Sequence, residues 1–423
     1  MAHLIIRNIG PIKEVDIELN KINVIMGPQS SGKSTINKIA CYCSWVEKTV
    51  LMEQSFDNFN HDIFVNKLIS FHKLDGYIRD DSYIHYESNV LKMICEYGVV
   101  NLDWKDKYAY KRPKISFIPS ERNIIATIPN WWEVKFSGNN IRNFMAEWNE
   151  SRVPYTVDSP LEILKLGVKY YYDKSSGADY VSIDENNDLK LTNTSSGLQS
   201  IIPLCVLIEY LTRWIYDNLE NQSVKYIEQA IELSSKLFDE VYNKTTKDID
   251  RTGDKRTIRI GPDGVKTNFS FSSLSKEDAA KFETQLSKLT KNQNTELYIE
   301  EPEQNLFPSS QRDLMYFLLK AIKGNMDHKL FLTTHSPYIL YALNNCMMGY
   351  LVKDNMPEDE AKELLCYPAW IDPKLVSVWE IVDGRLRNIQ DKDNIVSENY
   401  FDQKMTELTN EYYQMLNYYE DEE

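Results

Sequence analysis

The sequence predicts an α/β fold, a mixed β-sheet with an antiparallel edge and flanking helices, interrupted by two mostly helical insertions. Three observations lead to this prediction. An apolar segment at residues 22–26 runs into a loop that contains two glycines, and a helical pattern follows, an order typical of a phosphate-binding loop. Two strand-like segments, 4–7 and 15–19, come just before it and are typical of an antiparallel edge. The apolar segments 297–299 and 330–332 both end in polar residues, as strands do at the ligand-binding edge of an open sheet.

The loop after residues 22–26 carries the strongest functional signal in the chain. From Gly27 to Ser34 it reads Gly-Pro-Gln-Ser-Ser-Gly-Lys-Ser, which fits the pattern G-x-x-x-x-G-K-[ST]. Its glycines let the backbone wrap closely around a polyphosphate, so that amide N–H groups and the positive end of the next helix face the anion. Lys33 would reach the β and γ phosphates of ATP, and the Ser34 hydroxyl would ligate Mg²⁺. The residues predicted to bind the nucleotide here are Gly27, Pro28, Ser30, Ser31, Gly32, Lys33, Ser34 and Thr35. A glycine turn before an ordinary helix is the alternative, but strand, loop, Lys-Ser and helix all occur in the expected order.

The length and composition indicate a folded, intracellular protein. With 423 residues, 42% of them apolar and 12% aromatic, the chain can bury the cores of about two to three domains. No apolar run approaches the ~18 residues that a membrane span needs, and the N-terminus enters a strand pattern without the layout of a signal peptide. We therefore expect a cytoplasmic protein without membrane contact.

The charge balance argues against nucleic-acid binding by the whole surface. The formal net charge is −15 and the pI is near 5.1, whereas sequence-independent binding to phosphate backbones needs a basic surface. A local basic patch stays possible, and the candidate cluster is Lys105, Lys107, Lys111, Arg112 and Lys114. A solvated charged face is the alternative for that cluster. The six cysteines show no paired C-x-x-C spacing, which argues against zinc ribbons and disulfide frameworks.

The chain divides into one discontinuous head and two insertions. We predict that residues 1–45, 111–203 and 296–423 form the head that carries the phosphate loop. Residues 46–110 are rich in aromatic and acidic side chains, contain no motif, and are predicted to form a mostly helical insertion. Residues 204–295 are predicted to form a second insertion, in which a long helical region is followed by a hairpin.

Two further polar segments lie next to apolar ones and are candidates for ligand binding. The strand-like segment 114–119 ends in Ser120-Glu121-Arg122-Asn123, where either a binding site or a surface turn is expected. Thr194-Ser195-Ser196-Gly197 precedes a strongly apolar helix, so its hydroxyls and free N–H groups lie at a helix N-terminus, a natural anion site. Taken alone, this second element also fits an ordinary helix cap.

Two strand ends carry candidates for catalysis. The segment 297–299 is followed directly by Glu300 and Glu301. In a phosphate-loop protein the first acid after such a strand holds Mg²⁺, and an adjacent acid can polarise the attacking water. We assign Glu300 to the metal and Glu301 to the general base, with solvent-facing acids as the alternative. His335 follows the segment 329–334, where a residue that senses the γ-phosphate is expected; a hydrogen-bonded structural histidine is the other interpretation.

Five motifs, in their order along the chain, resemble those of the ABC-type ATPases of the SMC, RecF and OLD group. They are Leu4 to Ile12, the phosphate loop, Thr194 to Leu198, Ile299 to Glu303, and Thr334 to Pro337. Within this group the chain looks most like the compact, stand-alone AAA-type ATP-binding proteins of prokaryotic anti-phage defence systems. The resemblance implies the fold of an ABC-type P-loop NTPase head, with ATP and Mg²⁺ as cofactors.

The resemblance also implies a homodimer that holds two nucleotides between the phosphate loop of one subunit and the signature motif of the other. Transferred to this sequence, Ser195, Ser196 and Gly197 belong to the signature motif, and Ser195 touches the γ-phosphate in trans. Glu303 to Leu306 becomes the loop that faces the other subunit. The implied catalytic residues are Lys33, Glu301 and the switch residue His335, and the implied metal ligands are Ser34 and Glu300.

Three departures from the family pattern bear on these assignments. Glu300 stands where an aspartate is more usual, as it does in OLD-like relatives. No clear glutamine of the Q-loop is present, so Ser120 to Asn123 fills that place by position alone. The whole second insertion separates Ser195 from Glu300, although these motifs usually lie close together. We therefore expect this insertion to project from the head in place of a coiled-coil arm.

The predicted function is a Mg²⁺-dependent ATPase switch that controls a separate effector, a nuclease or toxin, in anti-phage defence. One alternative is a DNA-repair ATPase that clamps DNA directly. Another is an OLD-like nuclease that binds metal through Asp391 and Asp393, a D-x-D that follows hairpin-like segments at 376–381 and 385–389. The same two residues also suit a polar loop. The chain then ends in a helical pattern from Tyr400 to Tyr419 with an acidic tail.

Overall fold

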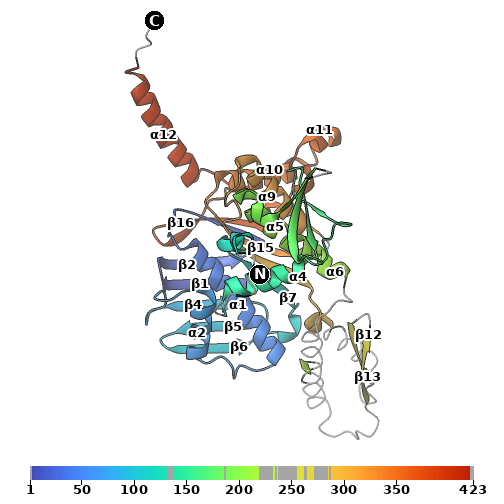
Figure 1. Cartoon of the computed structure of the whole chain (residues 1–423). Helices are drawn as coiled ribbons and strands as arrows, with labels where there is room; N and C mark the ends of the chain where they lie inside the picture. The colour runs from blue at the N-terminus through green and yellow to red at the C-terminus, as the bar shows by residue number, and fades with distance from the viewer. Residues whose placement is uncertain are drawn as a thin grey trace.

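One mixed β-sheet of eleven strands organises the structure (Figure 1). The computed structural model describes residues 2–128, 130, 133, 138–184, 187–218, 232–233, 236, 255–261, 264–270, 284, 287–324 and 326–419. The strands of the main sheet are β1 (Ala2–Ile9), β2 (Ile12–Leu19), β3 (Ile22–Met26), β4 (Tyr83–Glu87), β5 (Leu91–Glu96), β6 (Val99–Trp104), β7 (Pro113–Ile118), β14 (Asn294–Glu300), β15 (Lys329–Thr334), β16 (Val376–Val382) and β17 (Arg385–Asn388). Their order across the sheet is β6-β5-β4-β1-β2-β17-β16-β3-β15-β14-β7.

The sheet has an antiparallel half and a parallel half. β1 pairs antiparallel with β2 and β4, and β5 and β6 continue the antiparallel pairing beyond β4. β3 pairs parallel with β15 and β16, and β14 pairs parallel with β15 and β7. The predicted mixed sheet with an antiparallel edge is therefore confirmed. Because the carboxyl ends of parallel strands meet at one edge, the segments after β3, β14 and β15 come together there.

Helices cover both faces of this sheet. They are α1 (Lys33–Glu53), α2 (His61–His72), α3 (Ile124–Thr127), α4 (Asn140–Ser151), α5 (Ser196–Glu209), α6 (Ile215–Asp217), α9 (Pro308–Ile322), α10 (Pro337–Val352), α11 (Glu358–Glu363) and α12 (Tyr400–Leu416). α1 and α2 share one apolar cluster with the antiparallel strands, and α4, α5, α9 and α10 share a second cluster. In β14, Tyr298 belongs to the first cluster and its neighbour Ile299 to the second. This alternation is expected of a strand that is buried on both faces.

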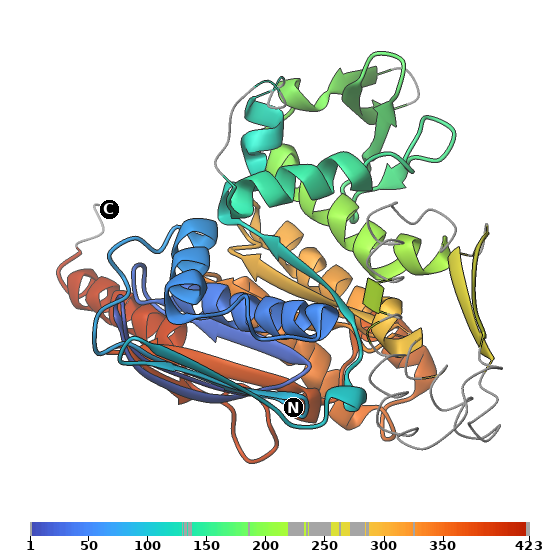
Figure 2. The ribbon, with the colours of Figure 1, turned by 90° about the horizontal axis from the view of Figure 1, so that it is seen from below.

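A smaller antiparallel sheet accompanies α4 and α5 on one side of the main sheet (Figure 2). Its strands are β8 (Leu161–Glu162), β9 (Lys169–Asp173), β10 (Ala178–Asp184) and β11 (Asn187–Lys190), in the order β11-β10-β9-β8. In the second insertion, β12 (Lys255–Gly261) and β13 (Gly264–Ser270) form the predicted hairpin. Most of the long helical region that we predict for this insertion lies outside the described residues.

The prediction of a mostly helical insertion at residues 46–110 is wrong in its second half. α1 and α2 account for the helical part, but β4, β5 and β6 extend the antiparallel edge of the main sheet. Alternate side chains of β5, namely Leu91, Met93 and Cys95, are buried. This period of two residues places one face of the strand on the core and favours a strand over a helix.

The C-terminal hairpin predicted at residues 376–389 is present, and it occupies the middle of the sheet. β16 pairs antiparallel with β17 and parallel with β3, so that Glu380 lies in register with Met26. Ile381 contacts the phosphate loop, because a Cβ placed on Gly27 would lie 3.3 Å from the Ile381 Cβ. β16, which lies about 350 residues after β3 in the chain, is therefore the neighbour of β3 in the sheet and packs against the phosphate loop.

One helical segment of the described chain meets the length and hydropathy that a membrane span needs. It runs from Ser196 to Asp217 and contains 22 residues, and its most apolar stretch of 18 residues has a mean hydropathy of 1.3, with 61% of that stretch buried within the structure. It consists of α5, a π-helical stretch at Tyr210–Trp214, and α6. α5 packs against α4 and α9, as a core helix does.

His72 gives the fold a dependence on pH. Its side chain is 1% exposed at the end of α2, and its ring contacts those of Phe71 and Phe117 at centroid distances of 4.8 and 5.1 Å. Burial, helped by the nearby Lys38 ammonium, lowers the pKa of His72 to about 3. In the folded protein this ring therefore stays neutral under mildly acidic conditions.

The free energy of unfolding is expected to fall by about 2 kcal/mol through His72 between pH 7 and pH 5. The folded pKa of about 3 lies below the ordinary value of 6.5, so only the unfolded chain takes up this proton as the pH falls. The contribution is complete above the ordinary pKa and is lost below it. Urea denaturation at both pH values measures the effect. His72→Phe should remove it, whereas an equal loss in both proteins would show that other groups are responsible.

Candidate functional site

The phosphate loop connects β3 to α1 with the backbone geometry that its glycines allow. Gly27 and Gly32 have φ values of 151° and 107°, and Ser30 has a φ of 58°. A Cβ on Gly32 would lie 2.9 Å from Ile12 Cγ1, so both the conformation and the packing at this position require glycine. α1 begins at Lys33, which places its N-terminal N–H groups at the loop, as the sequence predicts.

Lys33 is buried at the base of this loop. Its Nζ donates hydrogen bonds to the carbonyl oxygens of Gly27 and Pro28, at 2.8 and 2.6 Å. Burial lowers the pKa of Lys33 to about 8, and the negative charges of Glu301 and Glu303 oppose that shift. The ammonium is therefore mostly charged at neutral pH and lies close to the acidic segment after β14.

Ser34 and Glu300 come together, as predicted for a metal site. Glu300 is the last residue of β14 and is 4% exposed. Burial raises its pKa to about 7, although the Lys38 ammonium and a hydrogen bond from Ser34 oppose that shift. Glu300 Oε1 lies 4.0 Å from Lys38 Nζ and, within the described residues, has no hydrogen-bond partner.

A buried carboxylate oxygen without a hydrogen bond, beside a hydroxyl, fits Mg²⁺. This ion prefers oxygen ligands and usually takes only one or two carboxylates, with water and substrate phosphates completing its shell. Among the described residues, no group of three or more histidine, cysteine or acidic side chains could hold a metal ion by itself. The residues that would hold Mg²⁺ are thus Ser34 and Glu300.

Glu301 and His335 form a pair at the carboxyl ends of β14 and β15. His335 Nε2 lies 3.2 Å from Glu301 Oε1, and this contact is the main reason that the pKa of Glu301 lies below its usual value. The Glu301 backbone has a φ of 44°, and its N–H donates to Thr333 O at 3.0 Å. The structure therefore gives Glu301 an ionised, partly exposed carboxylate whose backbone is in a left-handed conformation.

Glu303 forms a second contact between the segments that follow β14 and β15. Its Oε1 accepts a hydrogen bond from the backbone N–H of His335 at 2.5 Å, and burial raises the pKa of Glu303. Asn305 in turn contacts α5, because its Nδ2 donates a hydrogen bond to Ser200 Oγ at 3.0 Å. The loop Glu303–Leu306 thus lies between the acidic segment and α5 within one chain.

Arg122 lies in the polar segment Ser120 to Asn123 that the sequence marks as a candidate, but the sequence gives this residue no role of its own. Its side chain is fully buried, and its guanidinium donates to five backbone carbonyls in three segments, at residues 119, 200 and 300–302. Nε donates to Ser200 O at 3.1 Å, Nη1 to Glu300 O at 3.0 Å and Pro119 O at 3.4 Å, and Nη2 to Glu301 O at 2.7 Å and Pro302 O at 3.1 Å. The signal available in the sequence is a charged residue immediately after an apolar strand, at the place of the missing Q-loop glutamine.

Ser195, Ser196 and Gly197 lie at the N-terminus of α5, as predicted. Ser195 is the cap of this helix, and its Oγ accepts a hydrogen bond from Leu198 N at 3.4 Å. Ser195 and Ser196 are exposed. Among the described residues, no hydrogen bond joins these three to the phosphate loop of the same chain.

Asp391 and Asp393 form a polar turn. Asp391 Oδ1 accepts hydrogen bonds from the backbone N–H groups of Asp393 and Ile395, at 2.9 and 3.0 Å. The side chain of Asp391 therefore stabilises the loop between β17 and α12. Of our two interpretations of this D-x-D, the contacts favour the structural one.

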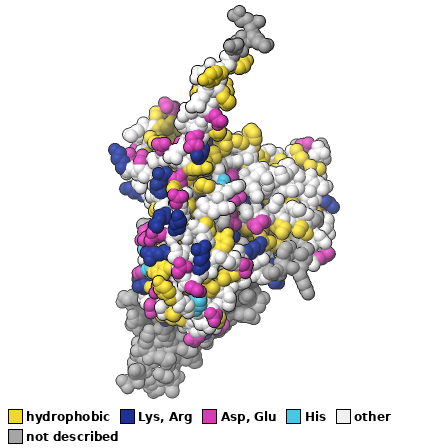
Figure 3. Space-filling view, turned by 90° about the vertical axis from the view of Figure 1, so that its left-hand side faces the viewer, with side chains coloured by type: hydrophobic (Ala, Val, Ile, Leu, Met, Phe, Trp, Pro, Cys, Tyr) yellow, Lys and Arg dark blue, Asp and Glu magenta, His cyan; other side chains and the backbone are white. Residues whose placement is uncertain are grey.

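The predicted basic cluster is largely neutralised by partners. Lys105 pairs with Glu87 at 2.7 Å, and Lys114 pairs with Glu147 at 2.8 Å. Lys107 donates to Gln54, and Arg112, which is 4% exposed, donates to Thr290 O. The face in Figure 3 likewise mixes basic and acidic side chains. The contacts do not support the patch expected of a nucleic-acid interface.

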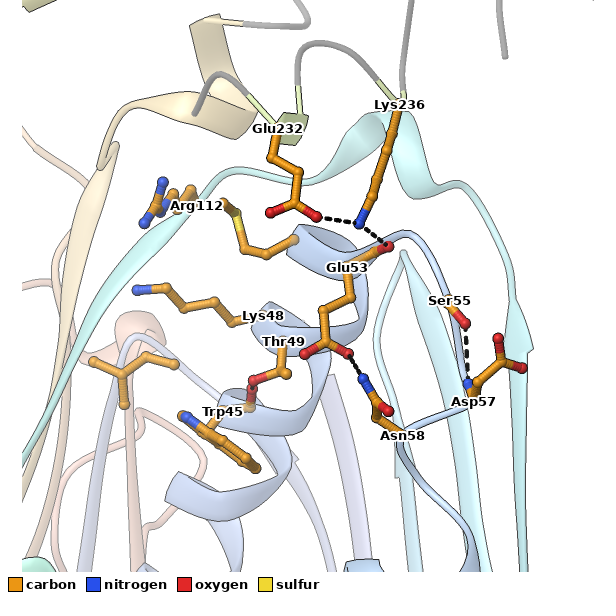
Figure 4. A pocket seen from close by; sticks show the side chains of 12 residues that line it. Trp45, Lys48, Thr49, Glu53, Ser55, Asp57, Asn58, Arg112, Glu232 and Lys236 are labelled. Atoms are coloured by element: carbon orange, nitrogen blue, oxygen red, sulfur yellow. Dashed lines mark hydrogen bonds and ion pairs between the residues drawn. The ribbon is translucent and has the colours of Figure 1, made fainter. Parts of the chain in front are cut away.

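A cavity of about 630 Å³ lies at the C-terminal end of α1 (Figure 4). Lys48 donates to Pro113 O at 2.7 Å on one wall. On the opposite wall Lys236 contacts Glu232 at 2.8 Å and Glu53 O at 3.2 Å. Trp45, the lining residue of α1 nearest to the loop, lies 12 residues after Lys33, so about 18 Å of helix or more separates this cavity from the phosphate loop. The cavity is distinct from the site built by Lys33, Glu300 and His335.

Comparison with known proteins gives one family match and several structural likenesses. A family described as "AAA ATPase domain" matches residues 263–340, which include β14, the acidic segment and His335. No curated protein matches the chain.

The SMC head domain from Thermotoga maritima matches at 10% identity and a TM-score of 0.36, with 94% of this chain and 98% of that chain covered. The recombination mediator RecF of the RecFOR pathway matches at 12% identity and a TM-score of 0.28, covering 92% of this chain and 97% of that chain. An SMC head bound to the C-winged helix domain of ScpA matches at 11% identity and a TM-score of 0.24, covering 92% and 96%. At these scores the likenesses carry no further argument, and the assignment of the fold rests on the strand order and the phosphate loop.

Proposed function

We propose that this chain is a cytoplasmic, Mg²⁺-dependent ATPase whose ATP-bound dimer acts as a switch. One observation carries the proposal: four segments that are far apart in the sequence meet at one sheet edge in the roles that ATP hydrolysis needs. They are the phosphate loop with Ser34, the segment of Arg122, the acidic residues Glu300 and Glu301 after β14, and His335 after β15. The match of residues 263–340 to an ATPase domain supports the same activity.

The chemistry follows from these positions. Lys33 and the N–H groups at the start of α1 bind the β and γ phosphates and neutralise their charge. Mg²⁺, held by Ser34 and Glu300, would supply additional positive charge next to the phosphate oxygens. Glu301 accepts the proton of the attacking water, whose oxygen bonds to the γ phosphorus while the bond from phosphorus to the β–γ bridging oxygen breaks. His335 keeps the Glu301 carboxylate in place and ionised.

The exposed signature residues argue for a dimer. Ser195 and Ser196 lie exposed at a helix N-terminus, and no hydrogen bond of the described residues joins them to the phosphate loop of their own chain. In a head-to-head dimer this helix end would face the γ-phosphate bound to the second subunit, so closure of the dimer would depend on the nucleotide. We further propose that the nucleotide state controls a separate effector protein, a nuclease or toxin, in anti-phage defence.

Ser195→Arg is expected to abolish ATP-dependent dimerisation and to lower ATP turnover at least tenfold, because the large cation would block the approach of the second subunit. Light scattering with and without ATP gives the mass, and phosphate release gives the turnover. Ser70→Arg, on the exposed side of α2, is the matched control and should behave as the wild type. Unchanged turnover and mass in Ser195→Arg would remove the signature helix from the mechanism.

A further inference from the structure

α12 projects from the body of the protein as an isolated helix (Figure 1). Its base is anchored, because Asn399 and Asp402 form a capping box and Tyr400 N donates to Glu380 Oε1 at 2.8 Å. Tyr341 of α10 also donates a hydrogen bond to Asp402. From Gln403 to Leu416 every residue is exposed. A single helix of this length is only marginally stable in water, so a partner is needed to stabilise it.

The apolar residues of α12 form a regular seam. Phe401, Met405, Leu408, Tyr412, Met415 and Tyr419 follow one another at alternating spacings of four and three residues. Beyond the base, the exposed fractions are 67% for Met405, 64% for Leu408, 58% for Tyr412 and 60% for Met415. Hydrophobic side chains are accordingly visible along the projecting arm in Figure 3. An average spacing of 3.5 residues is the pattern of a left-handed coiled coil, which indicates that the missing partner is another helix.

We propose that the partner is α12 of a second copy of this chain, in a parallel two-stranded coiled coil. In that arrangement Phe401, Leu408 and Met415 take the d positions and Met405 and Tyr412 the a positions. A helix with this seam is complementary to itself, since each copy supplies the same knobs and holes.

The charges of α12 favour this parallel pairing. Lys404 and Glu411 take the g positions, where they face the e positions of the second helix, occupied by Thr409 and Leu416. No two like charges meet across the seam. An antiparallel pair in the register that sets Leu408 against Tyr412, which overlaps most of the seam, would bring Glu411 against Glu411 of the second copy, which is unfavourable. Glu407 lies at an outer c position and faces water in either case.

The position of the helix adds a structural reason for pairing. Its base rests on Glu380, which lies in register with Met26, the residue before the phosphate loop. It also rests on Tyr341, in the helix that begins just after His335. The coiled coil would therefore start at the same sheet edge as the nucleotide site and hold two such edges near each other. Such a tether raises the effective concentration of the second head and does not require nucleotide.

A cysteine cross-linking experiment on the full chain without nucleotide tests the proposal. All six native cysteines are buried, so a single exposed cysteine can be oxidised selectively with diamide. Leu408→Cys places a thiol at a d position, where the two copies face each other in a parallel pair, and should give a covalent dimer on a non-reducing gel. Asn410→Cys, at the outer f position of the same helix, is the matched control and should cross-link at least tenfold more slowly.

A Leu408→Glu variant and the following results complete the test. Leu408→Glu should shift the nucleotide-free mass to that of a monomer, whereas a wild-type protein that is already monomeric at the highest soluble concentration would overturn the proposal. Equal cross-linking of Leu408→Cys and Asn410→Cys would also overturn it. If only a protein with both Leu408→Cys and Tyr412→Cys cross-links between copies, the helices are antiparallel and the orientation proposed here is wrong. Because nucleotide is absent throughout, these results are independent of the proposed ATPase activity.

Discussion

Glu301→Gln is expected to lower ATP turnover by about 10²- to 10⁴-fold, the range that a general base contributes. The glutamine amide has the size of the carboxylate and can keep a hydrogen bond to His335 Nε2, which lies 3.2 Å from Glu301 Oε1. It cannot accept the proton of the attacking water. ATP affinity, which depends on the phosphate loop, should change less than threefold. Phosphate release measures turnover, and equilibrium binding of a fluorescent ATP analogue measures affinity.

The same variant reports on the switch. If hydrolysis opens the dimer, Glu301→Gln should accumulate as a stable ATP-bound assembly when its mass is measured by light scattering. Glu360→Gln, at an exposed position of α11, is the matched control and should keep wild-type turnover and mass. A Glu301→Gln protein with wild-type turnover would exclude this carboxylate as the base.

Arg122→Met is expected to lower the free energy of unfolding by about 3–5 kcal/mol, the cost of removing one partner from a buried charged network. Methionine fills much of the same volume but removes the guanidinium donor from the backbone carbonyls of Ser200, Glu300 and Pro302. Glu301 O keeps only the hydrogen bond from Gln304 N at 3.2 Å. Buried carbonyls without a partner are costly. Urea denaturation measures the loss, and Arg142→Met, an exposed arginine of α4, should stay within about 0.5 kcal/mol of the wild type.

The Arg122→Lys variant tests whether Arg122 positions the Glu301 carboxylate or only stabilises the fold. The ammonium keeps the charge, but it cannot span Ser200 O and Pro302 O as the planar guanidinium does. Since Glu301 has a φ of 44° and its carbonyl loses the hydrogen bond from the guanidinium, its carboxylate should be misplaced. The turnover number should then fall at least tenfold while the Michaelis constant for ATP changes little. A stable Arg122→Lys protein with wild-type turnover would reduce Arg122 to a purely structural role.

Much of the site could be predicted because each part has a local signature. The phosphate loop follows from eight consecutive residues, and Glu300, Glu301 and His335 follow from the rule that polar residues after parallel strands share one edge. The structure places all of these together at the carboxyl ends of β3, β14 and β15. What remained open were roles that depend on a second molecule, such as that of Ser195.

The features that were missed depend on contacts between distant segments. Arg122 acts through the carbonyl oxygens of Ser200 and of residues 300–302, and no local pattern announces a partner that is only a backbone atom. The position of β16 between β17 and β3 is likewise a property of the whole sheet. By contrast, β4 and β5 had a local signal, because every second residue is one that the fold buries. The acidic and aromatic side chains around these strands obscured this pattern.

The position of β16 beside β3 affects the order in which the protein can fold during its synthesis. β3 is made from residues 22–26, but its neighbour β16 comes from residues 376–382. At the usual rate of translation the ribosome needs on the order of tens of seconds to produce the chain between them. Throughout that time one side of β3 lacks its permanent partner, and an unpaired strand edge promotes aggregation. The nascent chain should therefore depend on chaperones until residues 376–382 emerge, and only then can Ile381 pack against the phosphate loop.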